Sequence, residues 1–174
     1  MMVIRTLLLL TAGCAYHGPI HEQRQPAELV SMPDENYNFR WPLTHIAVTS
    51  PYGKRGRKFH EGLDLRARPG TPVHAAAAGK VIYSGSRIRG YGRVIVIRHD
   101  NGMTTVYAHN SRLIVKPNKH VEQGQVIALS GSSGRCRGPH VHFEMRRGVA
   151  TINPLHLLPL ASKPMLEYAS SLVP

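Results

Sequence analysis

Apolar residues recur along this chain in short strand-like runs from about Phe39 onward, and glycines separate the runs. The clearest runs are Arg93–Arg98 and Met103–His109, which are rich in β-branched residues. The segment between them ends in Asn101-Gly102, a strong hairpin signal because both residues tolerate positive φ. We therefore predict an antiparallel β-hairpin over residues 93–109.

Further segments have the same strand-like character: 79–84, 125–130 and 141–145. The alanine-rich stretch 72–79 is ambiguous, because four alanines favour a helix, but the segment is short and ends in glycine. We expect strand or turn there. The 16 glycines and 13 prolines indicate many turns, and no amphipathic helix longer than two turns is evident. The pattern predicts a mainly β fold with few short helices.

The N-terminal residues have a different pattern. Arg5 precedes the apolar run Leu7–Leu10, and small residues lead to Cys14. The run is too short to span a bilayer and is typical of an export signal. Small residues directly before a cysteine also resemble a bacterial lipobox, although the leucine lies four residues before the cysteine rather than the usual three. We expect lipidation at Cys14; the alternative is a plain secretory signal.

These patterns divide the chain into four parts. Residues 1–14 form the signal and lipobox segment, and residues 15–38 form a polar, proline-bearing linker or extension. Residues 39–159 form the folded domain, and residues 160–174 a C-terminal tail. We expect an exported protein, held at the periplasmic face of a bacterial membrane by a lipid anchor or else released into the cell envelope.

The charge is strongly positive, with 22 Lys and Arg against 10 Asp and Glu, a net charge of +12. Such a surplus favours anionic partners: nucleic acid, anionic lipid or an acidic cell-surface polymer. Nucleic acid is disfavoured, because an exported protein rarely meets it and the chain has no aromatic-interleaved binding motif.

Two short patterns carry candidate chemistry. His140 and His142 lie two residues apart, so in a strand their side chains point to the same face. His60 and Asp64 are four residues apart, a spacing that also shares one face, and Gly62 between them argues against a helix. Each pattern is weak alone, because paired histidines are usually surface residues and Asp64 could cap a turn.

Together the patterns give a more specific set. His60, Asp64 and His142 offer three ligands of mixed nitrogen and oxygen type, and three protein ligands are typical of a catalytic zinc site, whereas structural sites close with four. The chain has no Cys-x-x-Cys. His140 remains beside such a site, and His109, which closes the second hairpin strand, could reach toward it. Spare imidazoles can accept a proton or stabilise developing charge. The set suits amide hydrolysis with one Zn²⁺ per chain.

The chain from about Phe39 to Pro159 resembles the lysostaphin/LytM-type zinc metalloendopeptidases, which cut peptide cross-links in bacterial peptidoglycan. The resemblance rests on several stretches that occur in the family's order, which is more specific than any one motif. The matching stretches are Ser50–Arg55, His60–Leu65, Gly70–Val73, Ala77–Val81, Tyr91–His109, Val121–Ile127 and Gly138–Glu144.

The resemblance implies a fold, a function and residue roles. The family fold is an antiparallel β-sheet that lines a groove, with loops as walls. His60, Asp64 and His142 match the family's metal ligands, His140 its general base and His109 its second catalytic histidine. Some relatives lack these residues and act as non-catalytic activators of other wall hydrolases; here all five positions are filled. We therefore predict a zinc-dependent endopeptidase acting on peptidoglycan, with the activator as the alternative.

The roles of two basic segments can each be interpreted in two ways. Before Gly138 the family usually has small residues, whereas this chain has Arg135 and Arg137 on either side of Cys136. They could change substrate preference or could be plain loop, and Cys136 is expected to be a small idle residue. The run Gly53–Lys58 could bind a phosphate-rich polymer, or could be a solvated loop attracted to an anionic surface.

Overall fold

The computed structural model describes residues 38–160, and its regular elements are almost all strands. In chain order they are β1 (Val48–Ser50), β2 (Gly53–Arg55), β3 (Lys58–His60), β4 (Leu63–Arg66), β5 (Pro72–His74), β6 (Gly79–Gly85), β7 (Arg93–Arg98), β8 (Met103–Asn110), β9 (Arg112–Leu113), β10 (His120–Val121), β11 (Val126–Leu129), β12 (His140–Arg147), β13 (Ala150–Ile152) and the 3-10 turn η1 (Pro154–His156).

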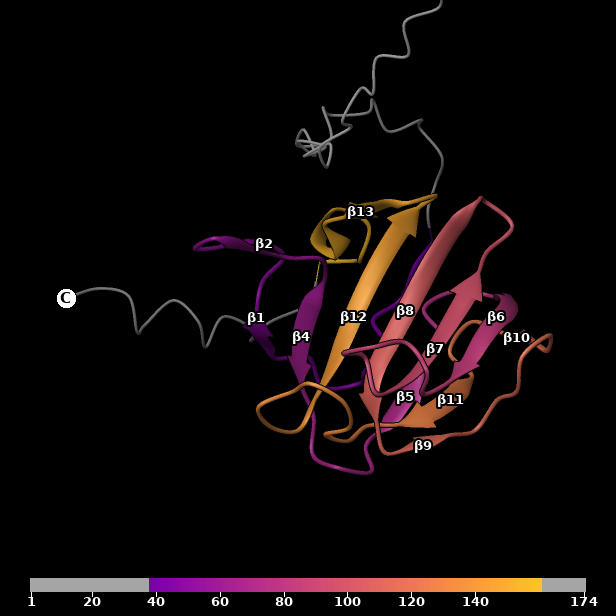
Figure 1. Ribbon diagram of the computed structural model, residues 1–174. Coiled ribbons are helices and arrows are strands. Elements are labelled where there is room, and N and C mark those ends of the chain that lie inside the picture. Colours follow the sequence, from indigo (N-terminus) through magenta and orange to yellow (C-terminus); the bar gives the residue numbers. More distant parts are fainter. Residues whose placement is uncertain (1–37, 161–174) are drawn as a thin grey trace, which may run out of the picture. The chain divides into compact units, whose positions relative to one another are not determined.

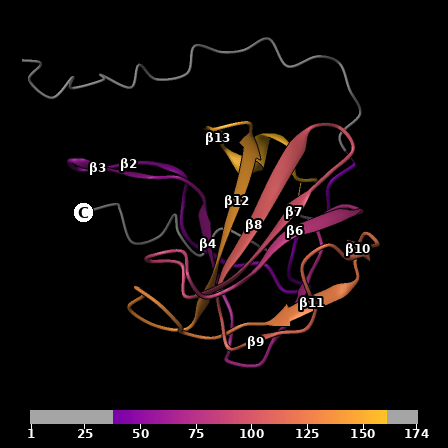
Figure 2. The ribbon, with the colours of Figure 1, turned by 45° about the vertical axis from the view of Figure 1, so that its right-hand side comes forward.

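The strands form one large sheet and two smaller units. The large sheet has the order β1-β4-β12-β8-β7-β6-β10, with β13 paired to β12, and Figure 1 shows its central strands side by side. A second sheet has the order β5-β11-β9. The hairpin β2–β3 projects away from the large sheet (Figure 2). All of these strand pairs are antiparallel, so the predicted mainly β, antiparallel fold class is confirmed.

The predicted hairpin is β7–β8, and its turn explains why the sequence folds this way. Gly102 has φ +75, a left-handed conformation that glycine adopts without steric cost. The side-chain oxygen of Asn101 accepts a hydrogen bond from the Met103 N–H at 3.0 Å. The turn residues therefore fix the register in which Arg98 faces Thr104.

The other strand predictions also hold. Segments 79–84, 125–130 and 141–145 correspond to β6, β11 and β12. The ambiguous stretch 72–79 is the short strand β5 followed by non-helical chain, as expected. The alanines do not form a helix there because their N–H groups have other partners: Ala75 donates to the Gln125 carbonyl and Ala76 to the Tyr107 hydroxyl.

The main core contains side chains from both sheets, and the two-residue period of β12 shows how it is organised. Val141, Phe143 and Met145 are fully buried in this core, and burying each such side chain contributes about 1.5–3 kcal/mol. The intervening residues of β12 are His140, His142 and Glu144, which point to the opposite face of the sheet. The packing that stabilises the fold thus places these three polar side chains together on one face.

Some expectations concern other parts of the chain. The signal and lipobox segment with Cys14, the extension up to residue 37 and the tail from residue 161 lie outside the described residues. Among residues 38–160, no helix has the length and apolar character that a membrane span requires.

Candidate active site

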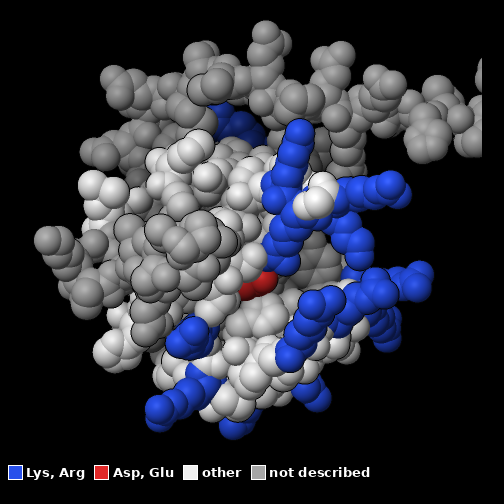
Figure 3. All heavy atoms as spheres, turned by 90° about the vertical axis from the view of Figure 1, so that its left-hand side faces the viewer, with Lys and Arg blue, Asp and Glu red and all other residues white. Residues whose placement is uncertain are grey.

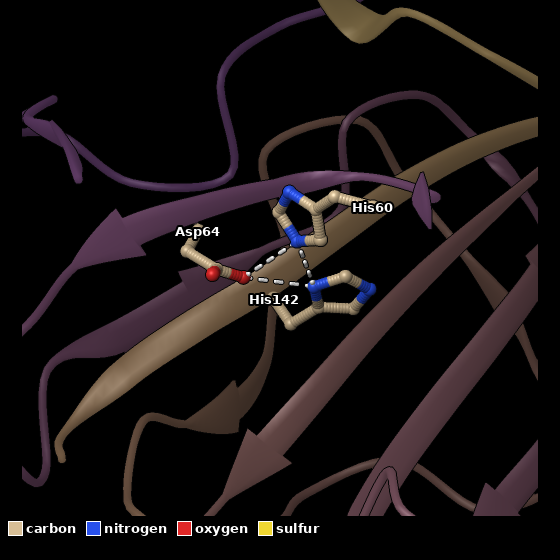
Figure 4. Close-up of side chains that lie close together, drawn as sticks. All are labelled: His60, Asp64 and His142. Carbon is tan, nitrogen blue, oxygen red and sulfur yellow. Dashed lines mark hydrogen bonds and ion pairs between the residues drawn. The ribbon is translucent and has the colours of Figure 1, made fainter. Parts of the chain in front are cut away.

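Two neighbouring strands and one hairpin bring together His60, Asp64 and His142. On β4 and β12, Asp64 lies directly opposite His142, and Asp64 Oδ1 is 2.9 Å from His142 Nδ1. His60 comes from the end of the projecting hairpin, and its Nε2 is 3.1 Å from Asp64 Oδ1 and 3.2 Å from His142 Nδ1. Figure 4 shows the three side chains pointing toward one another.

Gly62 makes this close approach possible. A Cβ atom at this position would overlap the backbone carbonyl oxygen of Phe143 on β12. Because glycine has no Cβ, the chain can pass tightly against β12 between β3 and β4. His60 is thereby held next to two residues that belong to other strands.

The ring nitrogens that face away from the cluster are also held in place. His60 Nδ1 is 2.7 Å from the Pro51 carbonyl oxygen, and His142 Nε2 is 2.8 Å from Glu144 Oε1. The inner nitrogens donate to the Asp64 carboxylate when they carry a proton. When each ring is neutral with its proton on the outer nitrogen, the inner nitrogens and the carboxylate instead present converging lone pairs. Three acceptor atoms that converge in this way fit a cation.

The geometry therefore fits the predicted metal ligands. One ligand atom from each of the three residues lies within 4.8 Å of the others. The separations of about 3 Å allow all three atoms to reach one ion with the bond lengths of about 2.0–2.2 Å that are usual for zinc. Cys136 is not part of this group; its thiol lies 3.1 Å from the Ser132 hydroxyl.

Glu144 supports His142 from behind. Its buried carboxylate also accepts hydrogen bonds from Arg146 Nε at 2.6 Å and from the Tyr91 hydroxyl at 2.7 Å. Arg146 in turn pairs with Glu61 at 2.7 Å. A carboxylate bonded to the outer nitrogen of a ligand histidine fixes the ring orientation and raises its basicity. Glu144 is thus placed to orient His142 toward the cluster.

The charges of the cluster follow from these contacts. Burial alone would raise the pKa of Asp64, but hydrogen bonds from His142, His60 and Arg55 hold it far below its usual range. Burial alone would lower the pKa of His142, but the Asp64 and Glu144 carboxylates raise it to about 9. Asp64 is therefore ionised throughout the physiological pH range, which favours a positively charged group at this point.

The two further histidines lie beside the cluster. His140 Nε2 is 3.5 Å from Asp64 Oδ1, and the His140 and His109 rings are 4.8 Å apart. Each has its Nδ1 within 2.8 Å of a backbone carbonyl oxygen, that of Gly138 for His140 and that of Ser133 for His109. Nε2 is therefore the nitrogen that each ring can offer to another molecule.

The backbone at His109 is unusual. Its φ is +65, a left-handed conformation that few residues other than glycine adopt and that costs on the order of 1–3 kcal/mol. The His109 N–H donates to the Tyr91 carbonyl, and the ring is bonded to Ser133. These two contacts hold an unfavourable conformation that directs the imidazole to the site.

Two charged side chains that contact the cluster, or a histidine of it, were not predicted from the sequence. Glu144 had a signal, since it follows His142 by two residues and so shares its face of the strand. Arg55 lies in the matching stretch Ser50–Arg55, but its contact with the cluster was not predicted, because its Nη2 reaches Asp64 Oδ2 at 2.9 Å only through the folding of the β2–β3 hairpin.

Comparison with known proteins agrees with this geometry. Residues 58–154 match the model of peptidase family M23. The chain is 41% identical over 125 residues to the uncharacterized lipoprotein YgeR of Escherichia coli K12, covering 71% of this chain and 49% of YgeR. It is 40% identical over 120 residues to the DD-carboxypeptidase/endopeptidase Mpg of Neisseria meningitidis, covering 66% and 27%. It is 36% identical over 121 residues to the murein hydrolase activator NlpD of E. coli K12, covering 70% and 31%. The chain thus spans half or less of the length of these relatives.

Solved structures show the same fold. A mutant of the catalytic domain of the prophage-encoded M23 protein EnpA from Enterococcus faecalis superposes with a TM-score of 0.60 at 36% identity, covering 64% of this chain and 90% of that domain. A zinc-containing peptidase from Vibrio cholerae superposes with a TM-score of 0.64 at 29% identity, covering 73% and 41%.

Proposed function

Since this chain belongs to peptidase family M23, we propose that it is a zinc-dependent endopeptidase that hydrolyses peptide cross-links or stem peptides of bacterial peptidoglycan. The observation that carries the proposal is the convergence of His60, Asp64 and His142 with two further imidazoles alongside. The relative named as the endopeptidase Mpg and the zinc-containing peptidase of similar fold support it.

Each residue then has a defined task. His60, Asp64 and His142 would hold one zinc ion, which polarises a substrate carbonyl and lowers the pKa of a water molecule to about 7. His140, whose Nδ1 is fixed by the Gly138 carbonyl, takes the water's proton at Nε2 and passes it to the leaving amine. Glu144 keeps His142 in the orientation that serves the metal.

The task of His109 depends on its protonation. Burial lowers the pKa of His109 below 6.5, so the ring is neutral at pH 7. Because Nδ1–H donates to the Ser133 carbonyl, the neutral ring offers Nε2 as an acceptor. To donate a hydrogen bond to the carbonyl oxygen, His109 must take up a second proton, at Nε2, from solvent, separate from the proton that His140 carries to the leaving amine.

The second candidate is a non-catalytic activator of other wall hydrolases. The relative NlpD, named as a murein hydrolase activator and 36% identical to this chain, favours it. The complete set of two histidines and an aspartate, with His140 and His109 beside it, favours the enzyme, because an activator has no need for spare imidazoles next to a metal site.

One experiment separates the two. The purified full chain is incubated with isolated peptidoglycan sacculi, and the released fragments are identified by mass spectrometry, with and without a zinc chelator. We expect new peptide termini that vanish with the chelator and return when zinc is added back. Release that persists with the chelator contradicts the zinc enzyme; release only when a second wall hydrolase is supplied supports the activator.

The proposed location is the periplasmic face of a bacterial membrane, through a lipid on Cys14. The relative YgeR, named as a lipoprotein, supports this. In cells, Cys14→Ser should move the protein from the membrane to the soluble fraction, and a variant that still fractionates with membranes would rule out lipidation at this residue.

A further inference from the structure

Exposed basic side chains lie on segments that contact the candidate active site. Figure 3 shows a hollow in which a small acidic surface is visible, with Lys and Arg side chains on both sides of it. Three segments next to the site carry exposed basic residues: the β2–β3 hairpin, the β6–β7 loop and the β11–β12 loop. We call the following six the wall residues: Arg57, Lys58, Arg87, Arg89, Arg135 and Arg137.

Specific contacts connect each segment to the site. The hairpin ends at His60. The β6–β7 loop contains Tyr91, which donates to Glu144. The β11–β12 loop contains Ser133, whose carbonyl holds His109. The wall residues therefore belong to the same segments that position the site.

The two loops are also fixed to each other. The Arg135 N–H donates to the Gly90 carbonyl at 2.9 Å, and the Arg93 N–H donates to the Ser133 hydroxyl at 2.9 Å. Gly92 packs so closely against Ser133 that a Cβ atom at Gly92 would overlap it. The loops thus form one wall whose arginines keep a defined place relative to His109.

Among residues 38–160, the wall residues have no carboxylate partner. Between residues 38 and 160 the acidic side chains are Glu61, Asp64, Asp100, Glu122 and Glu144. Glu61 and Glu144 pair with Arg146, and Asp64 pairs with Arg55. Within this range no ion pair involves a wall residue. Their charges are therefore available to a ligand.

We propose that the walls bind carboxylate groups of the substrate, so that the site prefers acidic peptides, with a free carboxylate close to the scissile amide, over neutral peptides. The inference rests on the proposed function and names its substrate class. Arginine forms paired hydrogen bonds with a carboxylate, and a cleft lined with one sign of charge concentrates ligands of the opposite sign. The walls thereby attract the carboxylate of the peptide and orient the amide next to it.

The arrangement favours a peptide over a membrane surface as the anionic partner. Lys and Arg side chains lie on both sides of a hollow (Figure 3), and an extended chain can lie between them. Docking on a membrane requires basic residues on a surface that can lie against the lipid headgroups. An acidic peptide brings its negative charge into the hollow together with the amide that the histidines can act on.

The test uses two synthetic peptides that are identical except that one has a glutamate and the other a glutamine next to the same amide bond. Binding to the metal-free full chain is measured by calorimetry. We expect the glutamate peptide to bind about tenfold more tightly, the effect of one charged hydrogen bond. The difference should shrink as salt is raised. Equal affinities would overturn the proposal.

Matched variants locate the effect. R135Q/R137Q should bring the two affinities close together, whereas K116Q/K119Q removes the same charge from the exposed loop before β10 and should leave the difference intact. If both double variants lose the preference for the glutamate peptide to a similar degree, the preference is a general charge effect and the proposal is overturned. The comparison of the two peptides on the unaltered chain does not depend on whether any variant folds.

Two outcomes separate this inference from the proposed function. If the metal-free chain discriminates between the peptides but the zinc-loaded chain cleaves neither, the proposed function fails and the wall assignment stands. If the zinc-loaded chain cleaves both with equal kcat/KM, the enzyme stands and the wall assignment fails. Binding to phosphatidylglycerol vesicles without discrimination between the peptides would assign the walls to a membrane.

Discussion

Two regions of this sheet contain buried histidines, and they use them in opposite ways. His99, which directly follows β7, is 4% exposed, and His60 in the candidate active site is 7% exposed. Burial therefore does not distinguish them. Both nitrogens of His99 have internal partners, at 2.8 Å from the Ala78 carbonyl oxygen and 2.8 Å from the Thr105 hydroxyl. His60 and His142 each give one nitrogen to such a partner and turn the other toward the cluster.

The difference in hydrogen bonding between these histidines shows which pattern leaves a ring nitrogen available to a ligand. A ring with two satisfied nitrogens has nothing left for a ligand, and it contributes hydrogen bonds and packing to the fold. A ring with one fixed nitrogen is held in orientation while the other nitrogen stays available. His140 and His109 follow the second pattern, since a backbone carbonyl fixes Nδ1 of each.

The largest effect should come from removing the carboxylate of the cluster. Asp64→Ala leaves two imidazoles where three ligand atoms converge. We expect zinc affinity and peptide hydrolysis to fall by at least about 10³-fold, more than the 10–100-fold that loss of an outer-shell partner costs. Zinc content after dialysis measures the first effect. The control is Asp100→Ala, an exposed acid in the β7–β8 turn, which should keep its zinc.

Removing an imidazole beside the cluster should separate metal binding from turnover. His140→Ala should keep its zinc, because His140 is not among the three converging ligands. Hydrolysis should fall by about 10²–10⁴-fold, the usual contribution of a general base. Zinc content and kcat are measured on the same sample. If His140→Ala and Asp64→Ala lose zinc equally, His140 is a ligand and the division of tasks is wrong.

A smaller effect should follow from neutralising the partner of His142. Glu144→Gln keeps the size of the side chain and removes the charge that holds His142 Nε2. We expect zinc affinity to fall by about 10–100-fold. Competition with a chromophoric chelator measures it without any substrate. Glu122→Gln, on an exposed turn, is the matched control; unchanged affinity in Glu144→Gln would show that Glu144 serves only the fold.

Local patterns predicted the parts of this molecule that depend on neighbouring residues. The Asn101-Gly102 turn and the β-branched runs beside it were enough for β7 and β8, because turn geometry and register are set within the hairpin. The spacing of His140 and His142 likewise placed both on one strand face. The shortest strands, such as β9 and β10, were not predicted, because two residues carry no periodicity of their own.

The features that could not be predicted depend on contacts between residues far apart in the sequence. Sequence spacing suggested that His60 and Asp64 share a face, but in the structure they lie on separate strands that Gly62 brings close to β12. Arg55 lies in the matching stretch Ser50–Arg55, but the spacing of its residues does not indicate that the guanidinium reaches Asp64 across the hairpin. The pairing of β4 with β12, which sets Asp64 opposite His142, is a tertiary contact between residues far apart in sequence.

The smallest effect concerns the histidine outside the site. Burial lowers the pKa of His99 below 6.5, so the unfolded chain binds this proton more readily than the folded chain. The free energy of unfolding should therefore decrease as pH falls below about 6.5, by at most about 1.4 kcal/mol per pH unit for one proton. His99→Gln, which can bond to both the Ala78 carbonyl and the Thr105 hydroxyl, should remove this part of the slope between pH 7 and pH 5. Urea unfolding of both proteins across that range measures it. An unchanged slope would mean that His99 titrates alike in both states, and that burial does not hold it neutral in the folded chain as this prediction requires.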